Sequence, residues 1–237
     1  MVPVYLQMTL GLGALETGIR IFPLSASLVL FSIVGTRLSR KMTPRTIVRI
    51  GQWMLVVSAV VLLGSATSDL RSGLFAVGMF LSGSALGLLA SQLGNVNMSS
   101  VAESQTSEVG GLQGVFQNLG SSLGTALVGS ILIGALSTSF ASGVAESDLS
   151  PATRSAVSSA TAGGVTIVPA ADVAGIAEEA GLGAADAEAL AAVYRDSQLS
   201  SLRVAFFGLI AISLLSLLFS RGIPTEIAVR RRASASP

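Results

Sequence analysis

The uncharged run at 110–136, GGLQGVFQNLGSSLGTALVGSILIGAL, constrains the fold of this chain more than any other feature. A helix rises about 1.5 Å per residue, so this run is long enough to cross a bilayer core of roughly 30 Å. Because no charge interrupts the run, it predicts a transmembrane helix rather than a buried helix of a water-soluble domain.

Small residues divide this run into two helix-packing motifs. Gly110 and Gly114 stand four apart, as do Gly120 and Gly124. Small residues at this spacing allow the backbone of another membrane helix to approach closely. The same spacing recurs at Gly83 and Gly87, in another apolar stretch.

Three side-chain amides also interrupt the run. Gln113 and Gln117 lie four residues apart on one helical face, with Asn118 beside them. An amide facing acyl chains is costly, so we expect all three to face protein or a water-filled path. Either they hold helices together, or they form the wall of a conduit.

Composition supports an integral membrane protein. The chain is 51% hydrophobic and 11% charged, with a mean hydropathy of +0.74, whereas a soluble domain carries about 25% charged residues. Cysteine and histidine are both absent, which removes thiol chemistry and the commonest general base and metal ligand. We therefore expect no enzyme activity, no cofactor and no metal site.

The apolar runs predict an all-α membrane protein with five full transmembrane helices and a partial N-terminal helix. The partial helix covers 1–13, and the crossings cover 18–38, 47–66, 73–93, 110–136 and 201–220. Between the last two crossings, 137–200 is predicted to be an extracytoplasmic helical loop, and 221–237 is a basic tail.

Basic residues gather in two places. The loop 37–49 has five and no acid, and the tail has four more arginines. Both clusters fall on the same side of the membrane in the predicted topology, so the positive-inside rule places both in the cytoplasm. We expect a multi-pass protein of the plasma membrane with a cytoplasmic C-terminus.

The outer side carries different signals. Glu16 and Arg20 stand four apart at the mouth of the first crossing, as an exposed rim ion pair or, alternatively, a charged gate. In the loop, Ser150 and Pro151 predict a helix start, and 169–180 predicts a short helix ended by Gly181. The loop is expected to be a solvated cap, with a substrate-screening lid as the alternative.

Two stretches resemble the fourteen-span drug:proton antiporters of the major facilitator superfamily. Tyr5-Leu6-Gln7, Gly11, the ALETG at 14–18 and Pro23 are similar to one of that family's motifs, and 111–132 is similar to its penultimate span. The resemblance covers the chain as the C-terminal half only, from late span nine to span fourteen. It implies a central cavity bordered by spans nine, ten, twelve and thirteen, with Tyr5 and Gln7 opposite the three amides.

A third stretch resembles the second copy of the superfamily's cytoplasmic loop motif. It runs from Gly35 to Lys41 and includes Arg37 and Arg40, with Ser39 standing where the motif has an aspartate. That replacement removes the carboxylate of the usual interhelical charge pair. A plain basic turn is the alternative interpretation.

Together these features predict the C-terminal half of a proton-coupled multidrug efflux transporter that works by alternating access. The expected partners are the lipid bilayer, small lipophilic or cationic substrates, protons and the missing N-terminal half, with no nucleic acid. No predicted crossing contains an acidic residue, so the proton-coupling carboxylate is expected in that missing half. The alternative is a non-transporting membrane scaffold or regulatory fragment derived from a transporter half.

Overall fold

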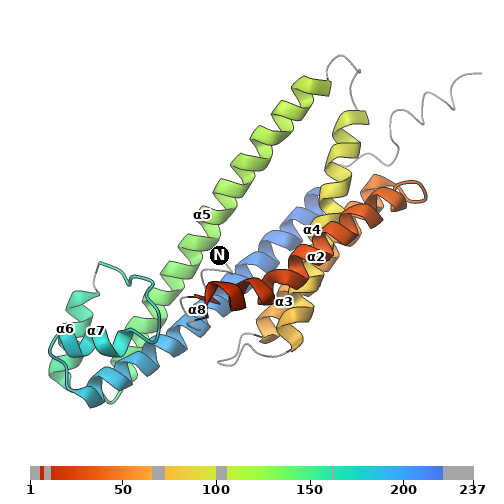
Figure 1. Cartoon of the computed structure of the whole chain (residues 1–237). Coiled ribbons are helices and arrows are strands. Elements are labelled where there is room, and N and C mark those ends of the chain that lie inside the picture. The colour runs from red at the N-terminus through yellow and green to blue at the C-terminus, as the bar shows by residue number, and fades with distance from the viewer. Residues whose placement is uncertain (1–5, 8–11, 66–72, 100–105, 162, 221–237) are drawn as a thin grey trace, which may run out of the picture. The chain divides into compact units, whose positions relative to one another are not determined.

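The computed structural model describes residues 6–7, 12–65, 73–99, 106–161 and 163–220, without the side chains of 94–99 and 106 (Figure 1). These residues form α-helices joined by turns, and no strand occurs among them. The helices are α2 (Ala14–Leu38), α3 (Pro44–Ser65), α4 (Gly73–Ser99), α5 (Thr106–Glu146), α6 (Pro151–Ala160), α7 (Val173–Glu179) and α8 (Ala184–Phe219).

Five of these helices, α2, α3, α4, α5 and α8, are long and apolar enough to cross a membrane. The prediction of an all-α membrane protein is thereby confirmed. Most of the partial helix predicted at 1–13 lies outside the described residues, as does the basic tail.

Two helices extend far beyond the predicted crossings. α5 continues past 136 to Glu146, and α8 begins at Ala184, well before 201. Apolar residues at helical spacing explain both extensions, since Leu136, Phe140 and Val144 are buried on one side of α5. The segment 137–200 therefore begins with the end of α5 and finishes with the start of α8, and α6 and α7 lie between them.

Contacts within the chain divide it into two compact units. Unit 1 consists of Met1–Arg20, Ala66–Asp69 and Thr125–Gly208, and unit 2 of Ile21–Ser65, Leu70–Gly124 and Leu209–Pro237. Each unit is described separately below.

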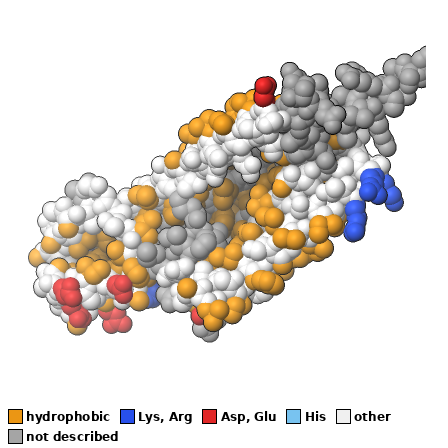
Figure 2. Space-filling view, turned by 45° about the horizontal axis from the view of Figure 1, so that its top comes forward, with side chains coloured by type: hydrophobic (Ala, Val, Ile, Leu, Met, Phe, Trp, Pro, Cys, Tyr) orange, Lys and Arg blue, Asp and Glu red, His pale blue; other side chains and the backbone are white. Residues whose placement is uncertain are grey.

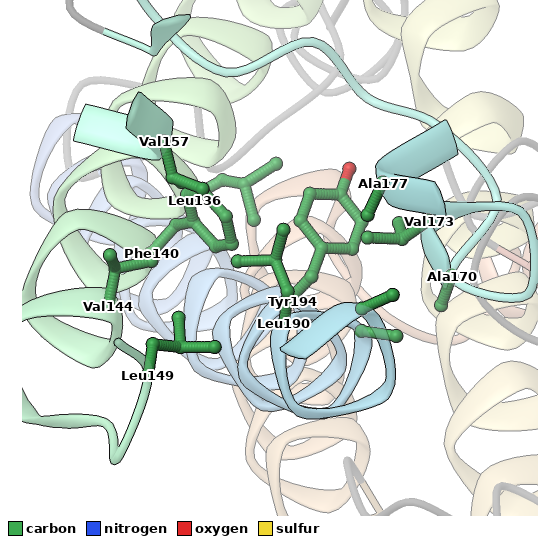
Figure 3. Packing of buried hydrophobic residues seen from close by; sticks show 12 residues of the cluster. Leu136, Phe140, Val144, Leu149, Val157, Ala170, Val173, Ala177, Leu190 and Tyr194 are labelled. Carbon is green, nitrogen blue, oxygen red and sulfur yellow. The ribbon is translucent and has the colours of Figure 1, made fainter. Parts of the chain in front are cut away.

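Unit 1 has a hydrophobic core of its own, shown in Figure 3. Tyr194 of α8 lies at its centre and meets Phe140 of α5 edge-on, with ring centroids 5.6 Å apart. Residues from α6 and α7 close the core from the other sides. The twelve buried members are Leu136, Phe140, Val144, Leu149, Val157, Ala170, Val173, Ala177, Ala187, Leu190, Ala191 and Tyr194.

Local signals set the ends of the two short helices in unit 1. Ser150 caps α6 as predicted, because its Oγ accepts a hydrogen bond from the backbone N–H of Thr153 at 3.1 Å, and Pro151 occupies the first turn. After α7 the chain turns at Gly181, whose φ of 91° is a conformation that favours glycine.

Unit 2 is organised by close packing on α4. Gly83 and Gly87 lie directly against the backbone of α2, and a Cβ on Gly87 would come within 2.8 Å of the backbone N of Ser32. On the neighbouring helix α3, the Nε2 of Gln52 donates to the backbone oxygen and the Oγ of Ser216 in α8, at 3.2 and 2.9 Å. Small side chains and amide hydrogen bonds thus join the helices of this unit, as expected for helices in lipid.

Candidate functional site: the polar strip of α5

The three amides predicted from the sequence lie on consecutive turns in the first half of α5. Gln113 is half-buried, whereas Gln117 and Asn118 are exposed among the described residues. Two glycines of the same face, Gly114 and Gly124, are also half-buried. We call Gly110, Gln113, Gly114, Gln117, Asn118 and Gly124 the polar strip of α5.

The opposite side of the same helix is apolar and open. Side chains on this side are between 52% and 65% exposed. Positions 110, 113, 114 and 124, by contrast, are half-buried, and at about 100° per residue they all lie on the other side of the helix. The strip therefore faces away from the most exposed surface of α5, whose residues are Leu112, Val115, Phe116, Leu119 and Leu123.

Two glycines of the strip have no close neighbour. A Cβ added to Gly114 or Gly124 would meet nothing within 4 Å, and the same holds for Gly120, which lies outside the strip. Their backbone is therefore accessible to a further helix or to a solvated ligand. This openness contrasts with Gly83 and Gly87, which α2 already covers.

The chemistry of the strip is neutral hydrogen bonding. Each amide offers a carbonyl oxygen that accepts and an NH₂ group that donates, and none changes charge with pH. Such groups can bind a polar or cationic molecule through their oxygens. They cannot carry a proton across the membrane.

The other residues predicted for the substrate path do not join the strip. Tyr5 lies outside the described residues. Gln7 is described and exposed, and it belongs to unit 1, whereas the strip belongs to unit 2. Their predicted place opposite the amides stays a prediction.

The predicted cytoplasmic loop motif joins α2 to α4 through neutral groups. The Nε2 of Gln92 donates to the backbone oxygen of Gly35 at 3.2 Å and to the Oγ of Ser39 at 3.4 Å. Ser39 itself donates to the oxygen of Gly35 at 2.9 Å. Gln92, which is fully buried, thus links α4 to Gly35 and Ser39 without any charged group.

The two residues predicted for the outer rim form an ion pair. The Nη2 of Arg20 lies 3.1 Å from the Oε1 of Glu16, one helical turn away in α2. Glu16 is half-exposed, so the pair contributes little to stability.

Sequence reasoning missed a polar groove in unit 1, between the end of α5 and the start of α8. Its volume is about 390 Å³, and five of its nine lining residues are serines or threonines. The available signal was the recurrence of small hydroxyl residues at helical spacing in both segments. The lining residues are Thr138, Ser139, Ser142, Gly143, Glu146, Val193, Asp196, Ser197 and Ser200.

Comparison with known proteins points to membrane transport. The sequence is 27% identical over 128 residues to the multidrug efflux pump SdrM of Staphylococcus aureus (strain N315). The present chain is thus a multi-pass membrane protein that is similar in part to an efflux pump. The match covers 54% of this chain but only 28% of the pump, so the shared segment is less than a third of that protein. No protein-family model matches the chain, and no solved structure matches it.

Proposed function

We propose that this chain is one half of a proton-coupled multidrug efflux transporter of the plasma membrane, and that a second membrane half completes it. The partial similarity to an efflux pump and the five candidate membrane spans support a transporter. The observation that carries the proposal is the polar strip of α5, a row of amides and glycines along one side of the uncharged run 110–136.

The strip suits the binding of lipophilic or cationic compounds. Carbonyl oxygens of Gln113, Gln117 and Asn118 would accept hydrogen bonds from such a compound, or from water that accompanies it. An amide placed against acyl chains without a partner costs several kcal/mol, which for Gln117 and Asn118 favours polar surroundings. A polar path along the strip removes that cost.

Alternating access requires a cavity between two membrane halves. The open glycines of the strip leave α5 room for a neighbouring helix of the second half. The predicted crossings of this chain contain no acidic residue. The second half must therefore carry the titratable group that couples transport to protons.

The test is drug export from an efflux-deficient bacterial host. The chain is expressed alone and together with the reading frame upstream of its coding sequence, and efflux of ethidium is followed by fluorescence. We expect export only in the second case. Proton-coupled export by the chain alone would contradict the placement of the coupling carboxylate, and no export in either case would contradict the transporter.

Variants of the strip test its role within the active protein. Gln113→Ala and Gln117→Ala should change the relative efflux of different drugs while the protein level stays constant. Ser130→Ala, on the exposed side of the same helix, is the matched control and should change neither. A parallel fall in protein level and efflux would show instead that the amides only hold helices together.

A further inference from the structure

The turn between α2 and α3 carries a concentrated positive charge. Five basic residues lie within 37–49, and this stretch contains no acid. None of them forms an ion pair with a described carboxylate, since the ion pair in the described chain joins Arg20 to Glu16. The five are Arg37, Arg40, Lys41, Arg45 and Arg49, and Figure 2 shows a group of Lys and Arg side chains close together on the face that it draws.

An exposed apolar stripe on α3 continues directly from this charge. Trp53, Val57 and Val60 are 51%, 48% and 51% exposed, and they follow Arg49 at steps of four, four and three residues. Steps of three and four keep residues on one face of a helix. Positions Ile47, Gly51, Val56 and Leu62, in contrast, are buried against the rest of unit 2.

The geometry of α3 matches the two parts of a phospholipid. Arg49 is separated from Trp53 by four residues, or about 6 Å along the axis. Helical side chains lean toward the N-terminus, so the arginines of the first turns extend toward the membrane surface while their stems cover apolar surface. The guanidinium groups then lie at the level of lipid phosphates, and the stripe lies at the level of acyl chains.

We propose that this face of α3 binds an anionic phospholipid, with its phosphate at Arg45 and Arg49 and an acyl chain along Trp53, Val57 and Val60. A guanidinium matches a phosphate through two parallel hydrogen bonds. Five cations that have no partner among the described carboxylates favour a lipid with net negative charge over a zwitterionic one, by about fivefold for each basic residue near the surface. The apolar stripe favours a lipid over free phosphate, because free phosphate has no acyl chain to pack against Trp53, Val57 and Val60.

Trp53 is the only tryptophan in the chain and is thus a built-in probe of this face. The full chain is reconstituted in vesicles of unlabelled lipid that contain a small share of phosphatidylglycerol or phosphatidylcholine brominated on the acyl chain. Bromine quenches a neighbouring tryptophan, so the quenching curves give the relative binding of the two lipids. We expect phosphatidylglycerol to be preferred by roughly 25-fold or more, since Arg45 and Arg49 each contribute about fivefold.

Charge-matched variants localise the site. Arg49→Gln should reduce the preference by roughly fivefold. Arg195→Gln removes one charge from an exposed position in unit 1 and should leave the preference unchanged. The proposal is overturned if both lipids quench equally in the unmodified chain, if the two variants behave alike, or if millimolar inorganic phosphate abolishes the preference.

Discussion

The hydroxyl of Tyr194 is a specific test of how unit 1 is held together. This oxygen accepts a hydrogen bond from the backbone N–H of Val168 at 3.0 Å and donates one to the backbone oxygen of Thr166 at 3.0 Å. Tyr194→Phe removes both bonds and the longer one, of 3.4 Å, that the hydroxyl donates to the backbone oxygen of Val168. The substitution keeps the aromatic ring, which is buried in this core (Tyr194 is 2% exposed) and lies edge-on to Phe140.

The expected cost follows from the surroundings of the two lost partners. Thr166 is exposed, so its carbonyl can turn to water at little cost, whereas the N–H of Val168 is half-buried. An intramolecular hydrogen bond contributes about 1 kcal/mol, and a buried group left unpaired costs about 1–3 kcal/mol. We therefore expect the segment 163–168 to lose about 1–2 kcal/mol of local stability. Gln198 still anchors it, because its Nε2 donates to the oxygen of Val168 at 3.1 Å.

Hydrogen–deuterium exchange followed by mass spectrometry measures this loss directly. Exchange of a peptide covering 163–168 should accelerate roughly 5- to 30-fold in the variant, which corresponds to the expected free energy. Arg195→Gln, an exposed change on the same helix, is the control and should leave this peptide unchanged. Equal exchange in the variant and the unmodified chain would refute the role assigned to the hydroxyl, as would acceleration spread equally over α3 and α4.

Two further predictions concern helix packing. Gly83→Ala should lower the thermal unfolding midpoint, because its Cβ would overlap the backbone oxygen of Leu24 and force α4 and α2 apart. Gly114→Ala, whose Cβ would meet nothing within 4 Å, is the control and should not lower the midpoint. Equal midpoints in the two variants would contradict the close packing on α4. Cysteines at Ser139 and Ser200, whose hydroxyls lie 3.2 Å apart, should form a disulfide on mild oxidation of this otherwise cysteine-free chain. A shift in gel mobility that reductant reverses detects the bond, and its absence would contradict the contact between α5 and α8 in unit 1.

The membrane helices could be predicted from the sequence because their signal is local. An uncharged apolar run of sufficient length has few alternatives to a spanning helix, and the helix start at Ser150 follows from its own side chain. The same reasoning found the polar strip, since helical spacing alone puts Gln113 and Gln117 on one face.

The remaining structure depends on contacts between distant residues. Tyr194 holds a segment that is 26 to 28 residues away in the chain, and Gln92 reaches Gly35 across 57 residues. Nothing in the local sequence of Gln92 distinguishes it from a solvated amide. In the core of unit 1, several buried positions of α8 are alanines, whose small side chains give only a weak pattern of hydrophobicity.

The two sets of glycines share one sequence pattern and have opposite surroundings. In α4, the backbone of α2 occupies the space beside Gly83 and Gly87. The glycine pattern there corresponds to a contact within the chain. In α5, Gly114 and Gly124 stand open beside amides that acyl chains cannot satisfy. Since the pattern favours close helix approach in both places, the open set calls for a helix or a solvated passage that the described residues of this chain do not supply. The proposed second half of the transporter would supply this helix or passage. A simple membrane anchor has no need of either.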